Sequence, residues 1–395
     1  MDDIKSEAKG IEQDVVRWYR DLHRIPELHD QLPMTTAYVR SVLEELGIPY
    51  NVYSNSGIRA VIECCEGDKA IAFRADMDAL PVTEETGLPF ESEHKGCMHA
   101  CGHDAHTAML LGAAKVLLPY KKQLKGKIVL LFQPAEETSG GAKIMIEEGC
   151  LKDPDVNMLV NFHAGRLFPG IKNGQVGWKK GAVMASVDTF NVTVHGKGGH
   201  GAYPDECIDP IPIACQMILA LQNIISREIK PTHGAVITTG ELNAGTLVNV
   251  IPDTASFGGT IRTLDPADRE KVCIRMDEVF RGIAAATRST VDVKISHSYP
   301  VTVNDSRAVE FFVNSASKIV GKENLVEIPE PATGTEDISY YLQEVPGSFG
   351  TLGSLAPHSD GIYYPHHNSK FRIDEDCLYL GSAIYAQCGV DFLSD

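Results

Sequence analysis

Apolar residues recur with helical spacing near the start of the chain and then give way to short β-rich runs. Residues 11–47 predict two helices that are separated at Pro26. The elements expected after them are strands at 59–63 and 70–75, a helix at 104–118, and strands at 127–132 and 158–162. Strands that alternate with helices predict an α/β sheet, and such sheets carry their sites at the carboxyl edge.

The pattern changes from about residue 185, where apolar and polar residues alternate. The expected elements are strands at 188–194, 234–241, 254–263 and 291–297, with helices at 209–226 and 266–287. Their β-α-β-β-α-β order is typical of a ferredoxin-like domain. We therefore predict an inserted domain at 185–297 within a larger domain made of 1–184 and 298–395. The larger domain resumes with helices near 307–320 and 336–343, a glycine-rich stretch from Gly347 to Gly361, and a last helix at 374–388.

Length, charge and cysteine content narrow the class of protein. A chain of 395 residues exceeds the size at which one core stops growing, so two domains are expected. The formal net charge of -17 disfavours nucleic acid and anionic membranes as partners. The sequence shows neither a secretory leader nor an apolar run that could span a membrane, and its ten cysteines are too sparse for a disulfide framework. We expect a cytoplasmic protein.

A thiol and several imidazoles occur together between Gly96 and His106. Cys101 and His103 are two residues apart, so an extended segment would direct both side chains to one face, where they could hold one metal ion. A chance pairing is the commoner explanation of such a pair taken alone. His106 falls on the following helix, where hydrogen bonding or packing is expected rather than ligation, and Asp104 is placed to cap that helix.

Further acids and a histidine follow predicted strands. In Glu136-Glu137, one carboxylate can bind a metal while its neighbour accepts a proton from water; the alternative is a solvated acidic pair at a helix start. His163 ends an apolar run as a ligand or as an interior histidine. Asp76 and Asp78 can orient a ligand imidazole from behind, or can be turn residues. Their joint occurrence at strand ends favours a metal site.

Several motifs, in order along nearly the whole chain, resemble the M20 metallopeptidase family, in its aminoacylase-like amidohydrolase branch. The matching segments are 73–81 (FRADMDALP), 98–106 (MHACGHDAH), 132–137 (FQPAEE), 196–204 (GKGGHGAYP), 249–252 (NVIP), 259–262 (GTIR), 334–337 (GTED) and His366-His367. The resemblance implies a zinc-peptidase-like α/β catalytic domain that is interrupted by a ferredoxin-like lid or dimerisation domain.

The resemblance also implies a site for two divalent metal ions, with Glu136 as general base. The implied ligands are Cys101, His103, Glu137, His163 and His367, with His366 as the alternative to His367. A ligand set of thiolate, imidazole and carboxylate suits Zn, Mn, Co or Ni rather than Mg or Ca.

The implied lid residues are His200, which resembles a histidine that holds the oxyanion, and Asn249 and Arg262, which resemble residues that bind the substrate carboxylate. In the family, the lid histidine reaches the site of a partner subunit, so we expect a homodimer through the inserted domain.

The function implied by the resemblance is hydrolysis of the amide bond of N-acyl amino acids by water that the metals activate. A dipeptidase or an N-acetyl-diaminopimelate deacetylase of the same family is the alternative. Two further hypotheses come from other classes: Cys101 as a covalent nucleophile, and a metal-stabilised binding protein without turnover. Nucleobase deamination is disfavoured because the His-x-Glu and Pro-Cys-x-x-Cys signature is missing.

Overall fold

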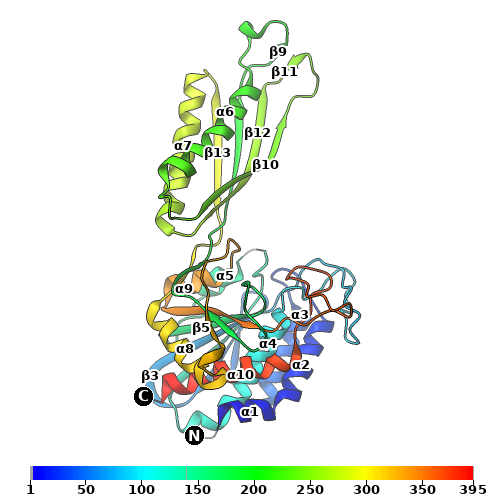
Figure 1. Cartoon of the computed structure of the whole chain (residues 1–395), viewed down its shortest axis with the longest axis vertical. Coiled ribbons are helices and arrows are strands. Elements are labelled where there is room, and N and C mark those ends of the chain that lie inside the picture. Colours follow the sequence, from blue (N-terminus) through cyan, green and yellow to red (C-terminus); the bar gives the residue numbers. More distant parts are fainter. Residues whose placement is uncertain (1–2, 139, 395) are drawn as a thin grey trace. The chain divides into compact units, whose positions relative to one another are not determined.

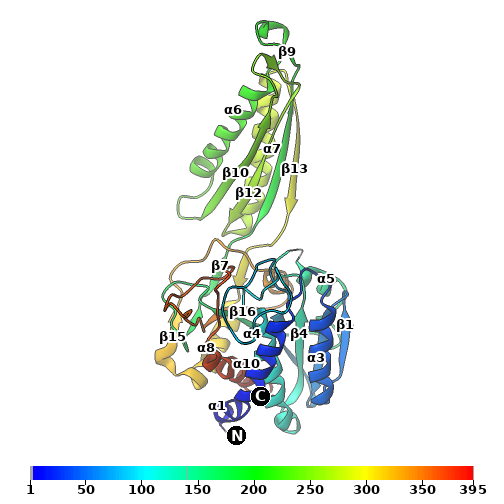
Figure 2. The ribbon, with the colours of Figure 1, turned by 90° about the vertical axis from the view of Figure 1, so that its right-hand side faces the viewer.

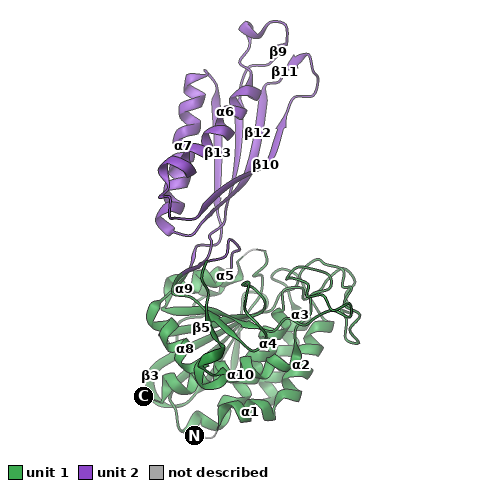
Figure 3. Ribbon diagram, in the orientation of Figure 1, with its two compact units in different colours: residues 1–181, 303–330, 337–395 green, residues 182–302, 331–336 purple. Residues whose placement is uncertain are grey.

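The computed structural model describes residues 3–138 and 140–394 (Figure 1). The chain forms two compact units, coloured separately in Figure 3. Unit 1 comprises residues 1–181, 303–330 and 337–395, and unit 2 comprises residues 182–302 and 331–336. The predicted inserted domain, 185–297, is shorter than unit 2 at both ends and lacks 331–336.

Unit 1 is built on a mixed sheet of eight strands. Across the sheet these are β1 (Tyr50–Tyr53), β2 (Gly57–Glu63), β4 (Lys125–Gln133), β3 (Cys65–Asp76), β5 (Met158–Gly165), β16 (Gly347–Gly353), β6 (Val176–Trp178) and β15 (Leu325–Glu327). The four central strands β4, β3, β5 and β16 run parallel. Their carboxyl ends therefore meet at one edge of the sheet, as the sequence predicts.

Helices cover both faces of this sheet. They are α1 (Ile4–Gly10), α2 (Glu12–Arg24), α3 (Pro33–Glu45), α4 (His103–Leu117), α5 (Gly141–Glu147), α8 (Ser306–Val320), α9 (Ile338–Glu344) and α10 (Leu378–Leu393). Successive residues of a strand point to opposite faces. On β3, Phe73 packs against Tyr385 of α10, whereas Arg74 pairs with Asp337 at the start of α9. Helices α10 and α9 therefore lie on opposite faces.

The α10 face holds the main core, and α4 is its central helix. Every residue of α4 except Lys115 is buried, so this helix lies inside the core on almost all of its faces. It packs so closely on α10 that a Cβ added at Gly112 would overlap Ser382. This packing fixes the first turn of α4, which begins at His103, against the ends of the parallel strands.

Unit 2 has the predicted β-α-β-β-α-β order. Its elements are β8 (Asp188–His195), α6 (Pro210–Asn223), β10 (Ala235–Ala244), β12 (Thr254–Thr263), α7 (Pro266–Ala286) and β13 (Thr290–His297). The antiparallel sheet has the order β10-β12-β8-β13, and α6 and α7 pack together along it (Figure 2). Four short strands complete the description: β7 (Gly181–Met184), β9 (Gly199–His200), β11 (Val250–Ile251) and β14 (Thr302–Asn304).

The termini of the two long helices of unit 2 follow from the local sequence. Asp209 and Asp265 cap α6 and α7 by accepting hydrogen bonds from the backbone N–H groups of the first turns, and each is followed by proline at the first helical position. Both helices bury one face against the sheet, in a core that is separate from that of unit 1.

Two elements differ from the sequence pattern. β16 lies within the glycine-rich stretch, where no strand was predicted, and all of its residues are buried. The last helix begins at Leu378, after a short 3-10 turn at Glu375–Cys377, and not at residue 374. No helix within residues 3–138 and 140–394 is long and apolar enough to cross a membrane.

Candidate metal centre

Cys101 and His103 lie on either side of a left-handed glycine at the start of α4. Gly102 has a φ of 89° and is the N-cap of the helix, so the segment is a turn and the predicted extended geometry is wrong. The turn nevertheless brings the two side chains together. Ligand atoms of Cys101, His103 and Glu137 all lie within 4.8 Å of one another.

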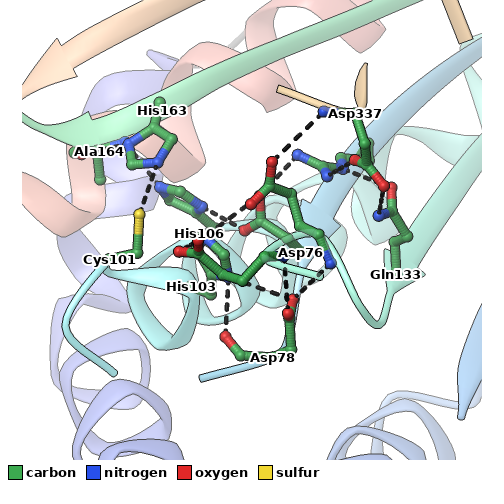
Figure 4. Close-up of polar contacts among 12 residues, drawn as sticks. Asp76, Asp78, Cys101, His103, His106, Gln133, His163, Ala164 and Asp337 are labelled. Atoms are coloured by element: carbon green, nitrogen blue, oxygen red, sulfur yellow. Dashed lines mark hydrogen bonds and ion pairs between the residues drawn. The ribbon is translucent and has the colours of Figure 1, made fainter. Parts of the chain in front are cut away.

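Glu136 and Glu137 follow β4 in a tight turn that Asp78 holds. The Asp78 carboxylate accepts the N–H of Glu136 at 2.9 Å and that of Glu137 at 3.0 Å (Figure 4). Glu136 is buried, with 6% of its surface exposed, so the alternative of a solvated acidic pair is wrong. The main-chain carbonyl of Asp78 accepts a hydrogen bond from His103 Nδ1 at 2.8 Å. Nε2 is therefore the nitrogen of that ring that remains available to a metal ion.

His163 lies near the end of β5 and faces the same thiol. Its Nε2 is 3.5 Å from Cys101 Sγ, while Nδ1 donates to the carbonyl of Ala164 at 2.7 Å. Burial lowers the pKa of His163 well below its usual value, so the ring stays neutral, which is the form that binds metals.

His106 links Asp76 to the backbone of Ala164 through hydrogen bonds and does not act as a ligand. Nδ1 lies 2.5 Å from Asp76 Oδ1, and Nε2 accepts the N–H of Ala164 at 2.8 Å (Figure 4). Both ring nitrogens are therefore occupied, as the sequence predicts for this residue. Asp104 does not supply the N-cap of α4; it is buried in the first turn and pairs with His23.

Asp76 is ionised and lies beneath the two imidazoles of α4. Burial alone would raise its pKa, but Arg74 and the rings of His103 and His106 hold that pKa well below the usual range. Arg74 itself is fully buried and bridges Asp76 and Asp337 at 2.6 Å each. Asp76 thus pairs with a fixed cation and lies 3.8 Å from His103 Nε2.

His366 and His367 both reach the site, where they contact different residues. His367 Nε2 is 3.1 Å from Glu137 Oε1, and its side chain is 55% exposed. His366 is grouped with Cys101 and His163, but its Nε2 accepts the N–H of Arg166 at 3.2 Å. Burial lowers the pKa of His366 to about 3. The distances thus bring every predicted ligand, and the alternative, to one place.

The chemistry of these side chains fits a cation. Within the described residues, the buried Nε2 of His103 has no hydrogen-bond partner. Burial opposes protonation of His103, yet Asp76, Asp78 and Glu137 raise its pKa to about 10. Burial, with Glu137 next in effect, raises the pKa of the Cys101 thiol well above its usual value. The carboxylates of Asp76, Asp78 and Glu137 thus lie around the Cys101 thiol and the unpaired Nε2 of His103. A divalent ion bound there would supply the positive charge that these carboxylates favour.

The three predicted substrate residues all belong to unit 2. His200 on β9 is exposed and pairs with Val250 of β11, and the carbonyl of Asn249 accepts the N–H of Gly201 at 2.9 Å. Arg262 on β12 donates from Nη1 to the carbonyl of Thr333 at 2.9 Å. His200 and Asn249 are therefore neighbours, and the roles of all three residues stay predictions.

Arg74, Gln133 and Asp337 are parts of the site to which the sequence reading gave no role. Gln133 Nε2 donates to Asp337 Oδ2 at 2.7 Å, and the Asp337 N–H points to Glu136 Oε1 at 3.4 Å (Figure 4). One signal was present in the sequence: Arg74 interrupts an apolar strand, and a charged residue in such a place needs a buried partner.

Comparisons with known proteins identify relatives of this chain. Residues 72–389 match the model of the peptidase family M20/M25/M40. An N-acetyl-L-cysteine deacetylase of Bacillus subtilis is 42% identical over 94% of this chain and 86% of its own length. A thermostable carboxypeptidase 1 of Saccharolobus solfataricus is 39% identical over 99% of this chain and 98% of its own. A Bacillus subtilis structure described as a dinuclear metal binding peptidase from the M20 family has a TM-score of 0.82 and 35% identity, covering 98% of this chain and 99% of that one. The chain therefore belongs to the peptidase family M20/M25/M40.

Proposed function

We propose that the protein is a metal-dependent amidohydrolase that cleaves the amide bond of N-acyl amino acids. One observation carries this proposal: a buried glutamate, Glu136, lies directly beside a group of metal-type ligands that includes Glu137, and Asp78 fixes both. The similarity to a protein named as an N-acetyl-L-cysteine deacetylase supports the substrate class.

The centre would hold two divalent ions, because its donors form overlapping groups around Cys101 and a similar structure is described as dinuclear. The proposed ligands are Cys101, His103, Glu137, His163 and His367. We prefer His367 to His366 because Nε2 of His367 lies 3.1 Å from Glu137 Oε1, whereas Nε2 of His366 accepts a backbone N–H and only its buried Nδ1 has no partner among the described residues. When bound, such ions polarise the amide carbonyl and lower the pKa of water to roughly 7.

The side chains supply the remaining steps. Glu136 accepts the proton of the attacking water and returns it to the leaving amine. Asp78 keeps Glu136 and Glu137 in one turn, so that base and ligand stay at a fixed separation. His200 would stabilise the oxyanion, and Asn249 and Arg262 would bind the carboxylate of the substrate.

The alternative of a cysteine nucleophile fits the site less well. A nucleophilic cysteine needs a lowered pKa, but burial and the surrounding carboxylates raise that of Cys101. A thiol hydrolase would keep its activity in excess EDTA, whereas the proposed enzyme loses it.

The deciding experiment compares the parent and Glu136→Gln on acetyl, benzoyl and indole-acetyl amino acids and on dipeptides, with Zn or Mn supplied. The parent should release the free amino acid from acylated substrates. The variant should bind as much metal but turn over about 100- to 10,000-fold more slowly. Preference for dipeptides would instead support a peptidase, an alternative that the similarity to a named carboxypeptidase favours. Turnover of no substrate would revive the binding-protein hypothesis.

We further propose a homodimer through unit 2 and a cytoplasmic location. β10 lies at the edge of its sheet and, with α6, exposes large apolar side chains: Val236 at 46%, Leu242 at 51% and Leu219 at 70%. Light scattering of the parent and of Leu219→Glu, a change on the α6 surface, tests the dimer. All ten cysteines lie among the described residues and are free, which supports a reducing compartment.

A further inference from the structure

Asp337 is a buried acid whose carboxylate is held from three directions. Arg74 Nη2 donates to Oδ1 at 2.6 Å, and Gln133 Nε2 and the N–H of Ala142 donate to Oδ2 at 2.7 and 3.1 Å. These donors come from β3, the end of β4 and α5. The residue therefore cannot shift without breaking several buried hydrogen bonds, one of them to a charged group.

The backbone of Asp337 faces the general base. Its N–H lies 3.4 Å from Glu136 Oε1 (Figure 4). Asp78 holds the main chain of Glu136 at the other end. A donor at the carboxylate restricts the rotamers of Glu136 and so fixes the oxygen that would accept a proton.

Arg74 joins this arrangement to the ligand side of the site. Its Nη1 donates to Asp76 Oδ2 at 2.6 Å and its Nε to Gln133 Oε1 at 2.9 Å. Asp76 in turn pairs with His106 and lies below His103. One buried guanidinium thus sets the positions of an acid beneath the metal ligands and of the acid that faces the base.

We propose that Asp337 is a positioning residue for Glu136: its carboxylate, locked by Arg74 and Gln133, fixes the backbone N–H that orients the general base. This inference rests on the proposed function, because it needs Glu136 to be the base. It gives a role to the Gly334–Asp337 motif, which neither the metal ligands nor the predicted substrate residues explain.

The test is a double-mutant cycle of Asp337→Asn and Glu136→Gln on the metal-loaded protein. An asparagine keeps the size of the side chain but replaces one of its two acceptor oxygens by an NH2 group that faces donors, so part of the lock is lost. Alone, Asp337→Asn should lower kcat by about 10- to 100-fold and leave KM within about twofold. In the Glu136→Gln background the same change should lower kcat by less than about threefold, because the base through which it acts is already lost.

Two readouts other than activity accompany the cycle: bound metal per chain, by atomic emission, and thermal unfolding. Metal content should stay at the parent value in all four proteins. Asp188→Asn is the matched control, because Asp188 is also fully buried and paired with an arginine, Arg269, at 2.6 and 2.8 Å, but lies in unit 2. It should lower the melting temperature and leave kcat unchanged.

The outcomes separate the two proposals. Equal losses of kcat in both backgrounds, or a loss that follows metal content, would overturn the positioning role and leave the proposed function intact. Full turnover of Glu136→Gln would overturn the assignment of the base itself. If Asp337→Asn does not fold, Gln133→Met takes its place, since it removes one donor to Asp337; it should lower kcat by about 5- to 10-fold with the same dependence on Glu136.

Discussion

Raising the pH from about 6.5 to about 9 should remove a stabilising charge from the interior of unit 1, at His23. His23 Nδ1 is 2.6 Å from Asp104 Oδ2, and Nε2 is 2.9 Å from Glu84 Oε1, with all three side chains buried. Burial alone would lower the pKa of His23, but the two carboxylates raise it to about 9. The other titratable groups that face the pair are Tyr19 and His99.

The sign and size of the effect follow from linkage. The folded pKa of His23 is above the unfolded value of about 6.5, so the stabilisation is complete below pH 6.5 and is lost as the pH rises through about 9. A difference of this size corresponds to about 3 kcal/mol, at about 1.36 kcal/mol for each pH unit. Because the ring is almost fully buried, solvent screening reduces this value little.

The assay is urea unfolding of the parent and of His23→Gln at pH 6, 7.5 and 9.5. The free energy of unfolding of the parent should be higher than that of the variant at pH 6. This difference should shrink by about 3 kcal/mol between pH 6 and pH 9.5. His233→Gln is the control, because His233 also pairs with an aspartate, Asp268, but its side chain is 32% exposed and solvent weakens the pair. Parallel pH dependences of the parent and His23→Gln would refute the reasoning.

Three further predictions concern the metal centre. Asp78→Ala removes the acceptor of two backbone N–H groups, so metal affinity should fall by about 10- to 100-fold in a chelator competition; unchanged affinity would contradict the role of Asp78 in holding the turn. Removing metal with EDTA should lower the melting temperature, because an ion at 100 times its Kd stabilises by about 2.7 kcal/mol. Glu137→Gln should bind less metal and show a smaller shift than the parent, and an equal shift would argue against ligation by Glu137.

The order of elements was predictable because apolar periodicity is a local signal. This signal did not predict β16. Its sequence contains glycine at 347, 350 and 353, which counts against a strand. The structure needs glycine there because other segments of the same chain approach closely. A Cβ at Gly350 would lie 2.8 Å from the carbonyl oxygen of Gly177 and 2.9 Å from Phe312. Tertiary packing, which the local pattern does not contain, thus sets the strand.

The ligands were easier to predict than their geometry. The residue types indicated a metal site around Cys101, His103 and the Glu136-Glu137 pair, and the resemblance to the family assigned Glu137 as the ligand; these assignments stay predictions. The reason given for the Cys-x-His pair was wrong, since the backbone at Gly102 is left-handed and not extended. That conformation depends on a glycine whose added Cβ would also press on Ile373, at 3.3 Å.

The support of the site depends on long-range contacts that no motif spacing reveals. Arg74 and Asp337 are 263 residues apart in sequence and 2.6 Å apart in space. A buried guanidinium between two carboxylates is costly to desolvate, and hydrophobic residues of similar size would often be at least as stable. Stability alone therefore does not explain the arrangement. The proposed function gives a reason for its geometry, because the same cation holds Asp76 beneath the proposed metal ligands and Asp337 beside the proposed general base.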